Sequence, residues 1–95
     1  MTEEVEFDVV TNNGKYRVAG YPFWHFGHQF AVHYEAFPDG LFAEWDVSHV
    51  ATGQLVSERP YSTRARAKRA AIAILDQHGE FGLAAAIYKA EHPDD

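Results

Sequence analysis

The hydrophobic pattern of this chain changes its period at about residue 62. Before that point, apolar and polar residues alternate in several short segments, as they do in strands with one buried face. After it, apolar residues recur at the spacing of an amphipathic helix. Strands followed by helices predict an α+β fold. No linker interrupts the 95 residues, so we expect one domain over residues 1–95, with its sheet at about 5–61.

The first two strands are expected to form a hairpin. Residues 5–10 alternate apolar side chains with acids, and Asn13-Gly14 follows. Both turn residues tolerate the positive φ angles of a type I′ turn. With these two residues at the turn, Val9 lies opposite Val18. The buried face then consists of Phe7, Val9, Tyr16 and Val18.

A second pair of strands is expected at residues 29–37 and 41–50, joined by a turn at Pro38-Asp39-Gly40. This turn places two pairs on the inner face, Tyr34 with Trp45 and Val32 with Val47. The outer face carries His33, Glu35, Glu44 and Asp46. A short fifth strand from Leu55 to Tyr61 is expected at the edge, because Pro60 has no N–H to donate. The sheet is therefore a four- to five-stranded antiparallel meander.

Two C-terminal helices are expected to cover one face of this sheet. Ser62 suits the N-cap of a helix over about 62–78, which Gly79 would end. A second helix is expected at about 80–91, before Pro93. The stripe of the first helix that faces the sheet consists of Ala67, Ala70, Ala71, Ile74 and His78.

The composition argues against several classes of protein. There is no cysteine, so disulfides and thiolate metal sites are impossible, and a reducing compartment is suitable. No stretch reaches the roughly 18 apolar residues of a spanning helix, and the first residues have no features of a secretion signal. We therefore expect a cytoplasmic protein with no membrane segment, and the sequence leaves its oligomeric state open.

The six histidines raise the question of a metal site. His25 and His28 are separated by two residues, and His33 is expected across the strand pair from Asp46, which would offer nitrogen and oxygen ligands. This spacing matches no specific metal motif. Polar turn and strand histidines are the commoner explanation, so we expect no metal and no cofactor.

Signals for catalysis are weak. The serines at positions 48, 57 and 62 lack the sequence surroundings that present and activate a nucleophile, and there is no glycine-rich phosphate loop. Glu35 and Glu44 could face each other as an acid–base pair, although a solvated sheet face is the simpler interpretation. We therefore expect no catalytic residues and a protein that is not an enzyme.

Carboxylates on the outer sheet face are the first candidate for partner binding. Glu35, Glu44 and Asp46 project from adjacent strands, with Glu6 and Asp8 available nearby. Fixed carboxylates can imitate a phosphate backbone and compete for a cationic groove. The stretch from Gly20 to His28 has no regular period, which predicts a loop or a bulged connection. Its aromatic residues are of the type enriched at interface hot spots. They are Tyr21, Phe23, Trp24 and Phe26, and they would equally suit a core.

This profile of small size, a net charge of −6 and no cysteine resembles that of proteins from phages and other mobile elements, including anti-CRISPR proteins. The resemblance is one of profile and transfers no residue. It implies a protein that inhibits a nucleic-acid-processing complex by binding to it. The leading hypothesis is thus a non-enzymatic protein that binds a protein or ribonucleoprotein through the acidic face and the aromatic loop.

Five of the 8 basic residues lie between positions 59 and 69, a segment with no acid. They are Arg59, Arg64, Arg66, Lys68 and Arg69. The run Ser62-Thr-Arg-Ala-Arg-Ala-Lys-Arg-Ala-Ala71 is similar to the Ser-Lys-Lys-x-Ala-Lys-x-x-Ala-Ala pattern of double-stranded RNA-binding domains. This resemblance spans residues 47–75 and implies that Arg64 and Lys68, with Arg59 and Arg66 beside them, contact phosphates. The alternative hypothesis is therefore a module that binds RNA or DNA.

Overall fold

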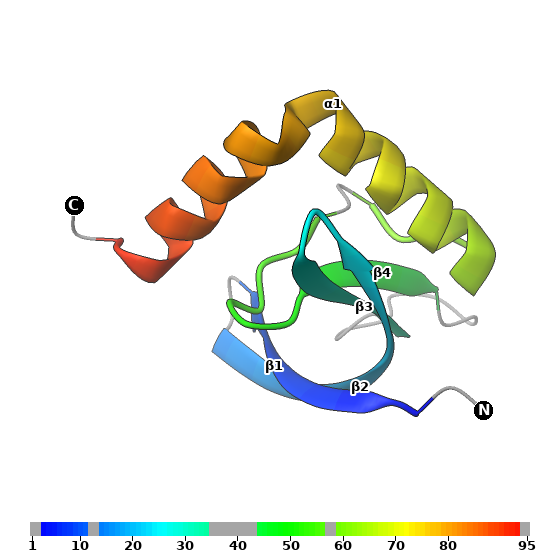
Figure 1. The fold of residues 1–95 in the computed structure, drawn as a ribbon. Helices are drawn as coiled ribbons and strands as arrows, with labels where there is room; N and C mark the ends of the chain where they lie inside the picture. Colours follow the sequence, from blue (N-terminus) through cyan, green and yellow to red (C-terminus); the bar gives the residue numbers. More distant parts are fainter. Residues whose placement is uncertain (1–2, 12–13, 35–43, 57–58, 94–95) are drawn as a thin grey trace.

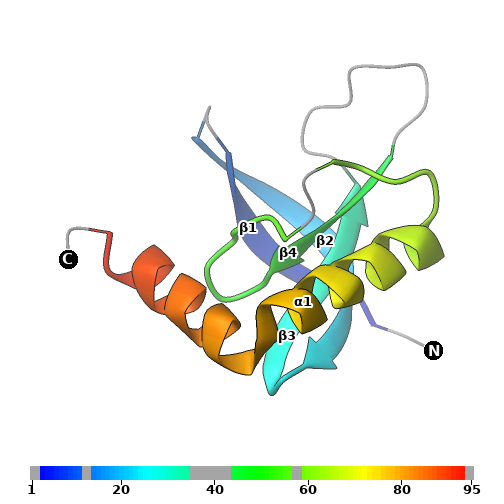
Figure 2. The same ribbon diagram turned by 90° about the horizontal axis from the view of Figure 1, so that it is seen from above.

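The computed structural model describes residues 3–11, 14–34, 44–56 and 59–93. Four antiparallel strands adjoin in chain order, and one long helix lies across the sheet (Figures 1 and 2). The elements are β1 (Val5–Thr11), β2 (Gly14–His25), β3 (His28–Tyr34), β4 (Trp45–His49) and α1 (Arg64–Glu91). The expected α+β class and antiparallel meander are confirmed. The described residues form four strands and one helix, where four to five strands and two helices were expected.

The first hairpin forms in a register other than the expected one. Val9 lies opposite Tyr16, so its expected pairing with Val18 is wrong. Gly14 does not occupy the turn but opens β2, where it pairs with Thr11. The partner of Val9 has shifted by two residues, which is one full period of a strand. The side chains expected to share a face therefore still share it.

The segment expected to be a loop, from Gly20 to His28, is instead the second half of β2 and a tight turn. Phe26 and Gly27 have φ angles of 51° and 79°, the two positive values that a type I′ hairpin turn needs. The strand shows no alternation in the sequence because aromatic side chains lie on both of its faces. Phe23 is 8% exposed beneath α1, whereas Trp24 on the other face is 67% exposed.

β2 changes its partner strand at a glycine. It pairs with β1 as far as Gly20 and with β3 from Tyr21 onward. A Cβ atom on Gly20 would lie 2.9 Å from the carbonyl oxygen of Val32, so only glycine allows this close approach. The β1–β2 hairpin curves around the side of the sheet that faces away from α1 (Figure 1). A second, small core forms there from Phe7, Val9 and Ala31.

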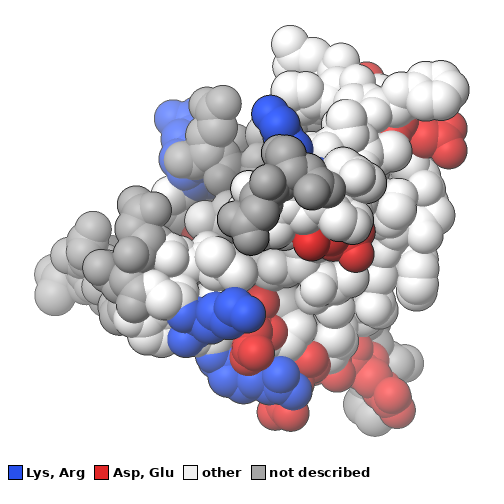
Figure 3. All heavy atoms as spheres, turned by 90° about the vertical axis from the view of Figure 1, so that its left-hand side faces the viewer, with Lys and Arg blue, Asp and Glu red and all other residues white. Residues whose placement is uncertain are grey.

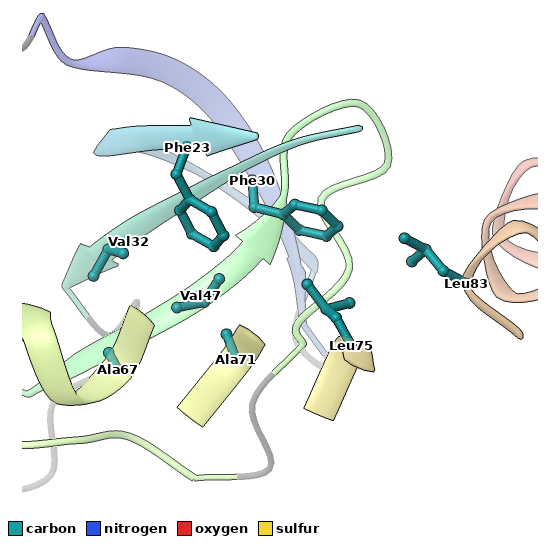
Figure 4. Close-up of a cluster of buried hydrophobic side chains, with 8 residues drawn as sticks. All are labelled: Phe23, Phe30, Val32, Val47, Ala67, Ala71, Leu75 and Leu83. Carbon is teal, nitrogen blue, oxygen red and sulfur yellow. The ribbon is translucent and has the colours of Figure 1, made fainter. Parts of the chain in front are cut away.

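The main core lies between α1 and the sheet (Figure 4). Its buried members are Phe23, Phe30, Val32, Val47, Ala67, Ala71, Leu75 and Leu83. The expected pairing of Val32 with Val47 is confirmed. Ala67 and Ala71 are fully buried, and their small side chains let the helix backbone lie close to the strands. His78, expected on the same stripe, is exposed.

α1 begins one residue later than expected and bends at Gly79. Thr63, not Ser62, is its N-cap, because the Thr63 hydroxyl accepts a hydrogen bond of 3.1 Å from the backbone N–H of Arg66. Gly79 has φ 76° and ψ 171°, a conformation that is essentially restricted to glycine. The chain then resumes a helical path in a new direction (Figures 1 and 2). The two expected helices are thus two arms of one kinked helix.

The described parts of the segment 55–61, residues 55–56 and 59–61, do not form the expected fifth strand. Two isolated bridges connect this segment to β4, Ser48 with Leu55 and Trp45 with Tyr61. The turn expected at Pro38-Asp39-Gly40 lies outside the described residues. Within the described chain, no helix combines the length and the apolar character needed to cross a membrane.

Candidate functional site

The outer sheet face that carries the carboxylates is partly covered, whereas it was expected to be open to solvent. His33 lies opposite Asp46 as expected, but it is only 1% exposed and was expected to face solvent. The ring of Phe7 packs edge-on against it with centroids 5.6 Å apart, because the curved β1–β2 hairpin covers this part of the face. Glu44 and Asp46 remain partly exposed, and Glu35 lies outside the described residues.

Charges of both signs are interspersed on the side that Figure 3 shows, which is the left-hand side of Figure 1. On the β1–β2 hairpin, a guanidinium nitrogen of Arg17 lies 3.5 Å from a carboxylate oxygen of Asp8. Both side chains are more than half exposed, so this pair contributes little to stability. Asp8 therefore does not extend an acidic patch.

The histidines considered as metal ligands lie in separate surroundings. His25 Nε2 lies 2.7 Å from a carboxylate oxygen of Asp76 on α1. The ring of His28 contacts that of His49, with centroids 5.6 Å apart. His33 is buried under the first hairpin. Across the described ranges, no three histidine or carboxylate side chains gather in a way that could hold a metal ion.

A buried serine–histidine pair occurs on the strands. His33 Nδ1 lies 2.7 Å from the carbonyl oxygen of Tyr34, so this nitrogen carries the proton and donates it. His33 Nε2, 2.8 Å from Ser48 Oγ, therefore accepts from the serine hydroxyl. Burial lowers the pKa of His33 and keeps the ring neutral. This is the arrangement of a nucleophile and its base, but Ser48 is 0% exposed and closed to a substrate, so the pair is structural.

The N-terminal arm of α1 places two cations over aromatic rings of β2, and a third cation lies over an aromatic ring just before the helix. Arg64 Cζ lies 4.1 Å from the centre of the Tyr21 ring, and Lys68 Nζ lies 5.3 Å from that of Phe23. Before the helix, Arg59 Cζ lies 5.7 Å from the centre of the Tyr61 ring. We name the whole region the cation–aromatic surface. It consists of Arg59, Arg64, Lys68, Tyr21, Tyr34, Trp45 and Tyr61, with Phe23 buried beneath Lys68.

Two regular spacings assemble the centre of this surface. Arg64 and Lys68 are four residues apart, so they lie on the same side of α1. Tyr21 and Phe23 are two residues apart on β2, so they lie on the same face of the sheet. The two pairs line an open groove of about 260 Å³ between the helix and the strand.

Tyr34 and Trp45 extend the surface beyond the start of the helix. Their rings stack with centroids 4.0 Å apart at an interplanar angle of 24°. The pairing of these residues is confirmed. Tyr34 is 54% exposed and lies outside the core, whereas Trp45 is partly buried and packs against the core. Trp45 also approaches the ring of Tyr21 at 6.2 Å and the guanidinium of Arg64 at 5.7 Å. The aromatic row thus runs continuously toward the cations.

Among the described residues, neither Arg64 nor Lys68 forms an ion pair with a carboxylate, and the first turn of α1 contains no acid. A cation near a helix N-terminus costs about 0.3–1 kcal/mol through the helix dipole. A cation–π contact returns a similar amount, about 0.5–1 kcal/mol at an exposed site. Because these two effects roughly offset each other, an anionic partner would add a favourable interaction that the cations lack in the free protein.

Neither the expected basic residues nor the expected aromatic residues all lie together in the structure. Arg66 and Arg69 are exposed on other sides of α1, where Arg66 donates a hydrogen bond of 3.2 Å to the Ser62 hydroxyl. Of the aromatic residues, Tyr21 and Phe23 join the cations, whereas Trp24 faces the opposite way and Phe26 lies in the turn. The spacing of Arg64 and Lys68 was visible in the sequence. Their aromatic partners were not, because β2 was expected to be a loop.

No protein-family model, no curated protein and no solved structure matches this chain. The chemistry of the cation–aromatic surface is therefore the observation from which a function can be inferred.

Proposed function

We propose that the protein binds nucleic acid through the cation–aromatic surface. The observation that supports this most is the position of Arg64 over Tyr21, with Lys68 over Phe23 beside it. A guanidinium that lies on a ring keeps its N–H groups directed outward in its own plane, where they can donate to phosphate oxygens. Two such cations, one helical turn apart along a groove, suit the regular charge of a phosphate backbone.

Pre-organisation strengthens this proposal. Long cationic side chains usually lose rotamer freedom on binding, at a cost of about 0.5–1.5 kcal/mol each. The ring contacts of Arg64 and Lys68 restrict these side chains before a ligand arrives. The overall charge of −6 slows encounter with a polyanion, but the cations of this surface belong to a segment, residues 59–69, that contains no acid.

The competing hypothesis is an inhibitor of the anti-CRISPR type that binds a protein or ribonucleoprotein through Glu44 and Asp46. The first hairpin covers the outer face at His33, and Asp8 pairs with Arg17, so less of the acidic surface remains for such a partner and we favour nucleic acid. Both hypotheses place the protein in the cytoplasm, and neither assigns it catalysis. An inhibitor of this kind would leave free nucleic acid unbound.

Binding of a labelled oligonucleotide at two salt concentrations tests the proposal. Two or three phosphate contacts should lower the affinity roughly five- to twentyfold between about 50 and 200 mM salt. Fluorescence anisotropy with the full chain measures both constants. No binding at the lower salt concentration, or an affinity that salt does not change, would refute nucleic-acid binding and favour the inhibitor.

A further inference from the structure

We infer that the nucleic acid bound by this surface is single-stranded, with an unpaired base on Tyr34 and phosphates at Arg64 and Lys68. This inference rests on the proposed function and specifies its substrate class. It depends on the arrangement of the aromatic rings, which phosphate binding alone would not require.

Tyr34 provides a platform for a base. One face of its ring lies on Trp45 at 4.0 Å, and 54% of the residue remains exposed, which leaves ring surface accessible to a base. An open aromatic face stacks with any unpaired base, because every base has a π face. In a duplex the bases are already stacked on one another, and only the last base pair could use such a platform.

The platform and the cations are neighbours on the surface. Trp45, directly beneath Tyr34, lies 5.7 Å from the guanidinium of Arg64. A base on the platform would therefore have its backbone close to the first cation. Lys68, one turn further along α1, continues the same row of positive charge toward Phe23.

The groove between β2 and α1 is open and lined by both cations, as a site for one flexible backbone would be. Arg64 and Lys68 line one side of it, Tyr21 and Pro22 line the other, and its volume is about 260 Å³. One flexible strand can lay its phosphates into such a groove while its bases turn toward the aromatic row. A duplex holds two backbones apart by paired bases, so it would reach the cations only from the rim.

The aromatic row is also fixed in place. Tyr34 and Trp45 are paired residues at the ends of β3 and β4. Backbone hydrogen bonds of 2.7 and 2.8 Å connect Trp45 to Tyr61 on the other side. A platform held in this way loses little conformational entropy when a base stacks on it.

Tryptophan fluorescence tests the inference directly. The chain contains 2 tryptophans, so Trp24→Phe leaves Trp45 as the only reporter. This variant is titrated with a thymidine homopolymer and, separately, with a hairpin duplex that has the same number of phosphates. We expect the single strand to quench Trp45 and to bind at least about tenfold more tightly than the duplex.

A matched pair of variants isolates the stacked base. Tyr34→Ala should weaken binding of the single strand about tenfold, whereas Tyr34→Phe keeps the ring and the affinity. Both changes should affect the duplex much less, because only its last base pair could use the platform. Equal affinities for both nucleic acids, no quenching, and equal behaviour of the two variants would overturn the inference and leave the proposed function standing. Failure to bind either nucleic acid would instead overturn the proposed function.

Discussion

Arg64, in the first turn of α1, lies over the ring of Tyr21 on β2 with 4.1 Å between its Cζ atom and the ring centre. This contact connects the start of the helix to the part of β2 that the sequence pattern did not predict. It also directs a cation toward a groove instead of leaving it free in solvent. The contact thus belongs both to the packing of the fold and to the proposed binding surface.

The glycines of α1 should respond oppositely to alanine. Gly79→Ala should destabilise the protein by about 1–3 kcal/mol, because the backbone angles at the kink suit only glycine. Gly82→Ala is the matched control three residues away. A Cβ there meets only the His78 Cβ, at an ordinary 3.4 Å, so alanine should stabilise the helix by about 0.5–1 kcal/mol. Urea unfolding measures both changes, and equal effects would contradict the kink as a required feature.

The stability of the fold should fall as the pH drops below about 6.5. Burial is the main cause that lowers the pKa of both His33 and His49 from the ordinary value of 6.5. The unfolded chain therefore takes up protons near pH 6.5 while the folded chain stays neutral at these positions. The stability present above that pH is lost on acidification, by at most about 1.4 kcal/mol per pH unit for each histidine.

Urea unfolding at several pH values between about 5 and 8 measures this slope. His33→Gln should reduce it, because glutamine does not titrate. A slope that is unchanged in both His33→Gln and His49→Gln would show that other groups cause the acid sensitivity.

Regular patterns allowed part of this fold to be predicted from the sequence. The pairing of β3 with β4 followed from alternation and was correct, including Tyr34 opposite Trp45. The second half of β2 was not predicted. The apolar side chains of Phe23 and Trp24 lie on opposite faces of the strand, so the sequence shows no alternation of apolar and polar residues there. Gly79 was interpreted as a helix end, since a C-terminal glycine and a kink glycine give the same local signal.

The site was predictable only in its charges. The density of cations identified the segment 59–69, and the resemblance to double-stranded RNA-binding domains singled out Arg64 and Lys68. Their partners Tyr21 and Phe23 come from a distant segment. Only the packing of α1 on the sheet brings the two pairs together. A cation–aromatic surface built from both segments is therefore a tertiary property that no local pattern contains.

A charge change on the acidic side should not weaken nucleic-acid binding. Glu44→Lys removes a negative charge next to Trp45, so we expect an unchanged or slightly higher affinity for a single strand. Anisotropy titration of the variant beside the unaltered protein measures it. A folded Glu44→Lys protein with clearly reduced affinity would identify Glu44 as a contact and support the acidic face as the site.

The central claim is tested most directly by reversing the charges of Arg64 and Lys68. The double variant Arg64→Glu, Lys68→Glu is compared with Lys15→Glu, Lys89→Glu, which changes the net charge equally at exposed positions of β2 and the last turn of α1. The dissociation constant for a labelled single strand is measured for both at the same salt concentration. We predict that the first pair weakens binding by at least about tenfold, or 1.4 kcal/mol, and the second by less than about threefold. Equal losses in the two variants, or a loss confined to the second, would contradict the assignment of nucleic-acid binding to the cation–aromatic surface.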